Sequence, residues 1–152
     1  LVEVQALVDG GGGGYSRRTA LGFDSGRLAM LLAVLHRHGG VSLHDMDVYV
    51  NVVGGLKISE PAADLAVLAA AHSSLRGVAI PRDVVVMGEV GLAGELRPVA
   101  NGEARLKAAQ QHGFKQAILP EGNRPRGSAT MRGLKIHAVA TLAAALDVLT
   151  SL

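Results

Sequence analysis

The segment at residues 62–75 is almost wholly apolar, and it restricts the fold more than any other part of the sequence. It is rich in alanine and leucine, which favour a helix, and Pro61 stands just before it, where a first helical turn tolerates proline. Ser59 is a candidate cap for this helix. A helix that is apolar on most sides must be buried on most sides, so the rest of the chain has to cover it from several directions. The hydrophobic content of 49% is enough for one such core.

The flanking segments alternate between helical and extended patterns. One helix is predicted to run to about His38, because Asp24 or Ser25 can cap its start and Gly39 and Gly40 can stop it. Further helices are predicted at residues 102–112 and 141–149, and strands at residues 1–8, 47–53, 84–86, 95–98, 116–119 and 134–138. Residues 56–58 form a further strand or a turn. This alternation predicts a single α/β or α+β domain over residues 1–152.

Five consecutive glycines occupy residues 10–14, directly after the first predicted strand. Such a run is costly to order, so we interpret it as a loop or an engineered linker and assign it no function. The chain begins at Leu1 rather than at a methionine, and we expect it to be a piece of a longer protein.

Basic side chains are concentrated in one stretch, although the chain carries a formal charge of only +2. Residues 97–135 contain eight lysines and arginines against two acids, Glu103 and Glu121. The eight are Arg97, Arg105, Lys107, Lys115, Arg124, Arg126, Arg132 and Lys135. A stretch of this kind is either a solvated surface or a contact site for phosphate groups.

Other features restrict the class of protein. Without cysteine, a disulfide framework and a thiolate zinc site are excluded within these residues, and a cytoplasmic location is expected. No apolar run reaches the roughly 18 residues that suggest a membrane span. No Walker-type phosphate loop is present, so we do not expect nucleotide hydrolysis from these residues. His36 and His38 are two apart on a helix and point in different directions, so we predict no metal site.

Two long stretches carry a specific resemblance. They read DVYVNVVGGLKISEPAADLAV at residues 47–67 and GEVGLAGELRPV at residues 88–99. Shorter matching elements are RR at 17–18, RLAM at 27–30, SS at 73–74, EARLK at 103–107, GF at 113–114 and LP at 119–120. Together these elements closely resemble the C-terminal domain of the bacterial RadA/Sms DNA repair proteins. The resemblance extends over nearly the whole chain and is interrupted only at the glycine run.

RadA/Sms proteins are in turn similar to Lon proteases, so the resemblance implies a ribosomal-protein-S5-like, Lon-proteolytic-domain-like fold. A Ser-Lys protease needs a hydroxyl nucleophile and a nearby amine that takes its proton. At the positions that match the serine and the lysine of Lon, this chain has Ala62 and Glu103. The resemblance therefore implies a pseudo-protease without catalytic residues. We interpret Glu103 as the acid of an ordinary i, i+4 pair with Lys107.

The resemblance further implies a scaffold domain that supports a hexameric ring and binds DNA without reading its sequence. The candidate phosphate-binding residues are Lys57, Arg97, Arg105, Lys107, Arg124 and Arg126. The expected partners are the DNA phosphate backbone, further copies of the chain and a RecA-like recombinase, with no membrane. No cofactor is expected in these residues, whereas ATP, Mg and Zn are expected in upstream domains. The alternatives are a residual Ser-Lys-type peptidase or peptide-binding module, and a purely structural oligomerisation domain.

Overall fold

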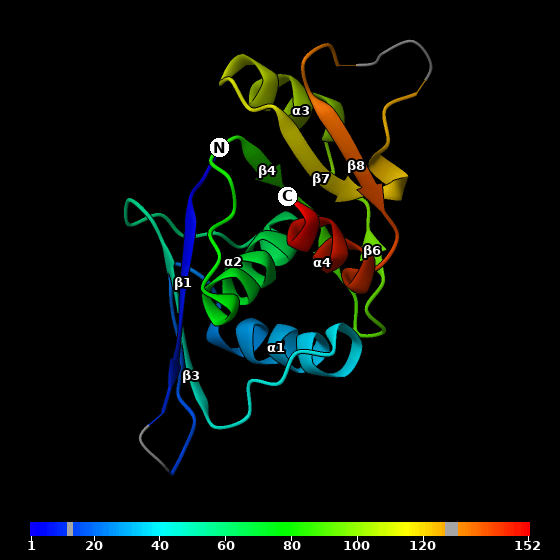
Figure 1. Ribbon diagram of the computed structural model, residues 1–152. Helices are drawn as coiled ribbons and strands as arrows, with labels where there is room; N and C mark the ends of the chain where they lie inside the picture. The colour runs from blue at the N-terminus through cyan, green and yellow to red at the C-terminus, as the bar shows by residue number, and fades with distance from the viewer. Residues whose placement is uncertain (12–13, 127–130) are drawn as a thin grey trace.

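A computed structural model of the chain describes residues 1–11, 14–126 and 131–152 (Figure 1). The helices are α1 (Ser25–Gly39), α2 (Asp64–Arg76), α3 (Gly102–Gln111) and α4 (Leu142–Ser151), with 3-10 turns η1 (Pro61–Ala63) and η2 (Glu121–Asn123). The strands are β1 (Val4–Gly10), β2 (Arg18–Leu21), β3 (Met46–Val52), β4 (Val84–Val86), β5 (Glu89–Val90), β6 (Leu96–Arg97), β7 (Gln116–Pro120) and β8 (Lys135–Val139). The predicted mixed α/β fold is confirmed.

The first sheet has the strand order β1-β3-β2. β1 pairs antiparallel with β3, from Val4 opposite Val52 to Gly10 opposite Met46, and β2 pairs parallel with β3. Alternate residues of β3, among them Val48 and Val50, are buried because they face the helices α1 and α2. This sheet and its two helices form the lower part of the molecule in Figure 1.

The second sheet is parallel, in the order β4-β7-β8. Between β4 and β7 in the sequence, β5 and β6 form a short antiparallel hairpin. Successive residues of β7 point to opposite faces. Ile118 belongs to the main core, whereas Ala117 and Leu119 pack with Leu106 of α3 in a smaller core. Because α3 covers one face and the other is continuous with the main core, both faces of β7 are buried.

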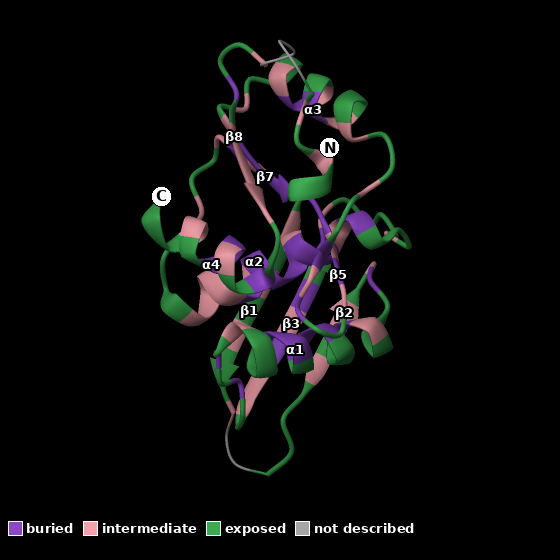
Figure 2. Ribbon diagram, turned by 90° about the vertical axis from the view of Figure 1, so that its right-hand side faces the viewer, coloured by how far each residue is buried: buried purple, intermediate pink, exposed green. Residues whose placement is uncertain are grey.

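The apolar stretch forms α2 at the centre of the molecule, as the sequence predicts (Figure 2). Its side chains Leu65, Val67 and Leu68 are fully buried. The main core surrounds this helix with residues of the first sheet, α1, α4 and the second sheet.

Two predicted helix caps are confirmed. The Asp24 carboxylate accepts a hydrogen bond from the Arg27 backbone N–H at 2.8 Å, and the Thr141 hydroxyl accepts one from the Ala144 N–H at 3.1 Å. Gly40 ends α1 in a left-handed conformation, with φ of 67°.

Two local predictions were wrong, and one strand was missed. Ser59 is not a cap, because Glu60 precedes η1 and Ala63 precedes α2, and neither side chain makes a capping bond. Residues 56–58 are not a strand, since they lie in an irregular connection. β2 was not predicted, because a four-residue strand with Arg18 at its start has almost no alternating pattern.

The glycine run lies only partly within the described residues. Gly10 ends β1, and the Gly11 N–H donates to the Asp45 carbonyl at 3.2 Å, whereas residues 12–13 lie outside the described part. Within the described ranges, none of the helices is both long and apolar enough to cross a membrane.

Candidate functional site

Ala62 lies at the N-terminal side of α2, in the turn η1, and is 7% exposed. Its carbonyl accepts a hydrogen bond from the Gly88 N–H, and the Gly88 carbonyl accepts one from the Leu65 N–H, both at 3.0 Å. These two bonds fix the start of the β5–β6 hairpin against the start of α2. Ala62 therefore has a rigid backbone environment, but its side chain is a methyl group.

A cleft of about 240 Å³ opens beside Ala62. Its described lining consists of Leu1, Val2, Val4, Ile58, Glu60, Ala62, Ala63, Ala66, Val85, Val86, Met87, Arg105 and Ala108. Within this described lining there is no hydroxyl, thiol, imidazole or lysine amine. The cleft therefore lacks both groups that Ser-Lys catalysis needs.

Arg105 closes one side of this cleft and is held in place. Its guanidinium NH2 donates to the Glu60 carboxylate at 2.6 Å, and its Nε donates to the Ala100 carbonyl at 2.8 Å. The two charged side chains of the cleft, Arg105 and Glu60, therefore form an ion pair with each other. Arg105 connects the start of α3 to the segment that leads into α2.

Glu103 lies in the first turn of α3, is exposed and does not line the cleft. The expected pairing with Lys107 is not formed, since no ion pair joins these two residues in the described part of the chain. Both side chains are exposed, and an exposed i, i+4 pair contributes only about 0.3–0.5 kcal/mol, so water competes with it.

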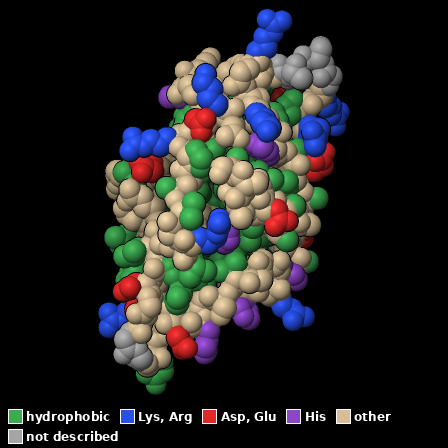
Figure 3. Space-filling model, in the orientation of Figure 1, with side chains coloured by type: hydrophobic (Ala, Val, Ile, Leu, Met, Phe, Trp, Pro, Cys, Tyr) green, Lys and Arg blue, Asp and Glu red, His purple; other side chains and the backbone are tan. Residues whose placement is uncertain are grey.

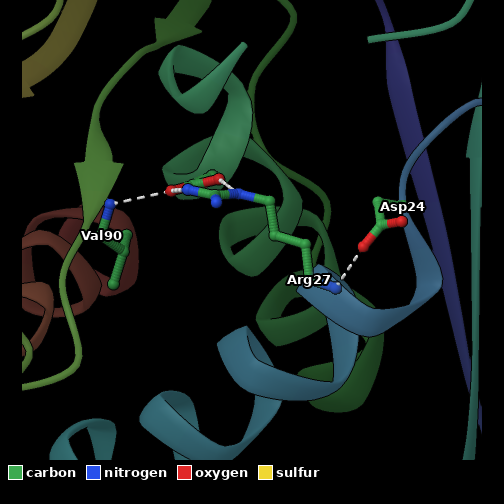
Figure 4. Close-up of polar contacts among 4 residues, drawn as sticks. Asp24, Arg27 and Val90 are labelled. Atoms are coloured by element: carbon green, nitrogen blue, oxygen red, sulfur yellow. Dashed lines mark hydrogen bonds and ion pairs between the residues drawn. The ribbon is translucent and has the colours of Figure 1, made fainter. Parts of the chain in front are cut away.

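A buried ion pair links α1, α2 and β5 (Figure 4). Asp64, the first residue of α2, is fully buried, and the Arg27 side chain is 33% exposed. Arg27 donates from Nε to Oδ1 at 2.7 Å and from NH2 to Oδ2 at 2.5 Å, and the Val90 N–H donates to Oδ2 at 3.1 Å. The hydrogen bond to Asp64 raises the pKa of Arg27. Such bidentate geometry partly offsets the cost of burying the carboxylate.

Sequence reasoning missed this pair as a structural site. Arg27 and Asp64 are 37 positions apart, so no local spacing relates them. The available signal was Asp64 itself, the single acid within the apolar stretch at residues 62–75. A carboxylate that must be buried with its helix requires a cation or several N–H donors nearby.

The structure distributes the six predicted phosphate-binding residues over several places. The segments that carry Arg97 and Arg124 lie side by side, because Pro98 packs on Gly122 and the Asn123 side chain bonds the Val99 backbone. Both arginines are in ion pairs, Arg97 with Glu95 at 3.3 Å and Arg124 with Glu121 at 2.7 Å. The hydrogen bond from Arg124 lowers the pKa of Glu121, so this carboxylate keeps its charge.

The three remaining predicted residues lie on three different segments. Lys57 is exposed in the connection after β3, Lys107 is exposed on α3, and Arg126 is exposed after η2. No ion pair involves these three residues within the described ranges. The six residues therefore come from several segments of the chain, and three of them, Arg97, Arg105 and Arg124, are paired with neighbouring carboxylates.

Comparisons with known proteins place the chain in a family. Residues 27–123 match the protein family described as "Subunit ChlI of Mg-chelatase". The match covers more than half of the chain. The chain belongs to this family.

Individual proteins similar to this chain carry a different name. The chain is 57% identical over 149 residues to "DNA repair protein RadA" of Pseudomonas aeruginosa, covering 98% of the chain and 32% of that protein. It is 53% identical over 152 residues to the Escherichia coli protein of the same name, covering 100% of the chain and 33% of that protein. The Synechocystis relative, also named RadA, is 42% identical over 148 residues, covering 97% of the chain and 29% of that protein.

These matches confirm the resemblance to RadA proteins that was stated from the sequence. The chain spans about a third of the length of these curated relatives.

The histidines are not gathered at any of these places. His72 is half-buried on α2, and burial together with the nearby Arg76 charge lowers its pKa. His137 on β8 contacts the Gln116 side-chain oxygen at 2.9 Å, and burial is the main cause that lowers its pKa. Across the described residues, no group of three or more histidines and carboxylates is placed to hold a metal ion.

Proposed function

We propose that this chain is a non-catalytic scaffold domain of a RadA-type DNA repair and recombination ATPase. The observation that carries the proposal is the match to RadA proteins over essentially the whole chain. In this proposal the domain supports a hexameric ring and contacts the DNA phosphate backbone. Nucleotide hydrolysis and branch migration of recombination intermediates belong to upstream parts of the protein, together with ATP, Mg and Zn. The protein works in the cytoplasm, with a RecA-like recombinase as a further partner.

The fold in this proposal is that of the Lon proteolytic domain, with residues 1–152 as one pseudo-protease domain. Ala62 occupies the position of the nucleophile and Glu103 that of the amine. The cleft supports this interpretation, because its described lining offers neither a hydroxyl nucleophile nor a lysine amine. Losing both partners of a Ser-Lys pair removes the reaction altogether.

DNA contact is proposed for the basic residues predicted from the sequence. Lys57, Lys107 and Arg126 have no ion pair in the described structure and are the stronger candidates. Arg97, Arg105 and Arg124 would first have to release a carboxylate, which reduces their contribution. Contacts of this type are independent of base sequence and depend strongly on salt.

Light scattering tests the proposal. The molar mass of the protein is measured in low and high salt, with and without a short DNA duplex. We expect a mass near six chains that increases with DNA at low salt only. A monomer whose mass does not respond to DNA would contradict both the ring and the DNA contact.

A second candidate function is peptide binding, and the free edge of β4 favours it. β4 is an edge strand of the second sheet, and a groove of about 780 Å³ runs along it beside α2. An extended peptide can add to such an edge by backbone hydrogen bonds. Binding of an unstructured peptide that is insensitive to salt would favour this function over DNA contact. Labelling by a serine-directed probe would instead indicate a residual peptidase.

A further inference from the structure

The three parallel strands of the second sheet start at the same end of the sheet, which we call its amino edge. A basic residue lies at or just before the start of each strand. Val84 of β4, Gln116 of β7 and Lys135 of β8 are in register. Arg82 precedes β4 by two residues, and Lys115 immediately precedes β7. Because neighbouring strands are about 4.8 Å apart, the three starts form a row about 10 Å wide.

Backbone hydrogen bonds hold this row together. The Lys115 N–H donates to the Asp83 carbonyl at 2.9 Å, and the Lys135 N–H donates to the Lys115 carbonyl at 2.8 Å. The Gln110 side chain donates to the Arg132 carbonyl at 2.6 Å and thereby connects α3 to the loop before β8. Arg132 is thus brought to the same edge.

We call Arg82, Lys115, Arg132 and Lys135 the amino-edge cluster. All four side chains are exposed. Lysine and arginine side chains gather on the upper part of the face shown in Figure 3, the part that contains α3, β7 and β8 in Figure 1. Lys107, already a candidate, lies one turn before Gln110 on α3 and is exposed as well.

Within the described residues, no carboxylate pairs with the charges of the amino-edge cluster. None of its four members forms an ion pair within the part of the chain that the structure describes. Two acids lie near this edge, Asp83 beside Arg82 in the sequence and Glu3 in the groove that Arg82 lines. Together they do not balance the four positive charges of the cluster. By contrast, Arg97, Arg105 and Arg124 each bind a carboxylate. A cation that has no partner is free to bind a phosphate without first breaking a contact.

Resting on the DNA contact proposed above, we propose that the amino-edge cluster is the surface through which this chain binds the DNA phosphate backbone. A row of cations on a rigid sheet edge fits phosphate contact, because its spacing is fixed by the strands. Base stacking is not part of this contact, since the neighbouring aromatic residue Phe114 packs against the smaller core. The contact is independent of base sequence and weakens as salt increases.

The test uses the full-length protein with a double charge reversal, Lys115→Glu with Lys135→Glu. Affinity for a short duplex is measured by fluorescence anisotropy between about 50 and 200 mM salt. We expect weaker binding at every salt concentration, and a slope of log K against log salt that is smaller by about two, one for each lost phosphate contact. The matched control, Arg17→Glu with Arg37→Glu, makes the same charge change just before β2 and on α1 and should leave the slope unchanged.

Three outcomes would overturn the inference. If the test and control variants lose DNA affinity equally, only the net charge of the protein matters for binding. The salt slope of the Lys115→Glu, Lys135→Glu variant could be unchanged while charge reversal of Lys57 and Arg126 lowers DNA affinity. The DNA contact would then lie at Lys57 and Arg126, and the proposed function would still hold. No loss in any of these variants would contradict the proposed DNA contact as well.

Two further measurements keep the result interpretable. Thermal unfolding and molar mass are compared for all variants, and a reversal variant that does not fold is replaced by Lys115→Gln with Lys135→Gln. A neutral variant that folds and retains the full slope overturns the inference. Loss of DNA binding that accompanies a lower molar mass does so too, because it would assign the edge to contact between copies.

Discussion

The buried carboxylate of Asp64 is the residue on which the junction of α1, α2 and β5 depends. It receives three hydrogen bonds, two of them from Arg27. Replacing Asp64 by alanine leaves the guanidinium and the Val90 N–H without their acceptor. Breaking one side of a buried ion pair costs about 3–5 kcal/mol, and because Arg27 is partly exposed we expect the lower end of this range. Urea unfolding measures the change in the free energy of unfolding.

A double-mutant cycle supplies the control for this prediction. If the two side chains act mainly on each other, Arg27→Ala with Asp64→Ala should cost clearly less than the sum of the single variants. Additive costs would contradict the pairing.

At Ala62 we expect that a restored hydroxyl does not restore catalysis. Ala62→Ser places a nucleophile beside the cleft, but the described lining still has no lysine amine or imidazole to take its proton. The variant should therefore remain unlabelled by a fluorophosphonate probe, with an active serine hydrolase as the positive control. Labelling of Ala62→Ser that the parent chain does not show would mean that a base is present.

At the scale of single elements, the fold was predictable wherever a segment carries its own periodic pattern. α1, α2 and α3 follow from leucine and alanine spacing with glycine or proline at their ends, and β3 follows from its valines. β2 was missed because its stability comes from β3 rather than from its own residues. Arg18 is held there by the carbonyls of Leu43 and Met46, which no local rule relates to it.

The same difference between local patterns and long-range contacts explains how much of the candidate site could be predicted. The sequence located the cationic stretch but could not tell paired from unpaired cations, because pairing depends on neighbours distant in the chain. Arg105 forms an ion pair with Glu60, which is 45 positions away in the sequence. The row formed by Arg82, Lys115 and Lys135 exists only once three strands are in register.

The helix α2 should make stability depend on pH through His72. Burial and Arg76 lower the pKa of His72 in the folded state below the ordinary value of 6.5. The unfolded chain therefore binds a proton that the folded chain does not, and stability falls as pH decreases through the unfolded pKa of 6.5. We expect His72→Gln to make the free energy of unfolding depend less on pH between about pH 7 and pH 5. His36→Gln, at an exposed position on α1, is the control, and an equal effect of both variants would contradict the assignment.

At the scale of the whole molecule, one core joins both sheets. The main core includes Val50 of the first sheet and Ile118 of the second, and α2 lies between them. The smaller core under α3 shares the strand β7 with the main one, since alternate residues of β7 belong to each. Neither sheet can lose its packing without exposing apolar surface of the other.

We therefore expect the domain to unfold as one cooperative unit. Leu68 of α2 is fully buried, and Leu68→Ala should lower the free energy of unfolding by about 2–5 kcal/mol through lost burial and a cavity. Hydrogen exchange would then accelerate equally in β3 and in β7, because both report the same global opening. Met30→Ala, at an exposed position on α1, is the matched control and should leave exchange nearly unchanged. Faster exchange in β3 alone would mean that the two sheets unfold separately and that the core shared through α2 does not couple them.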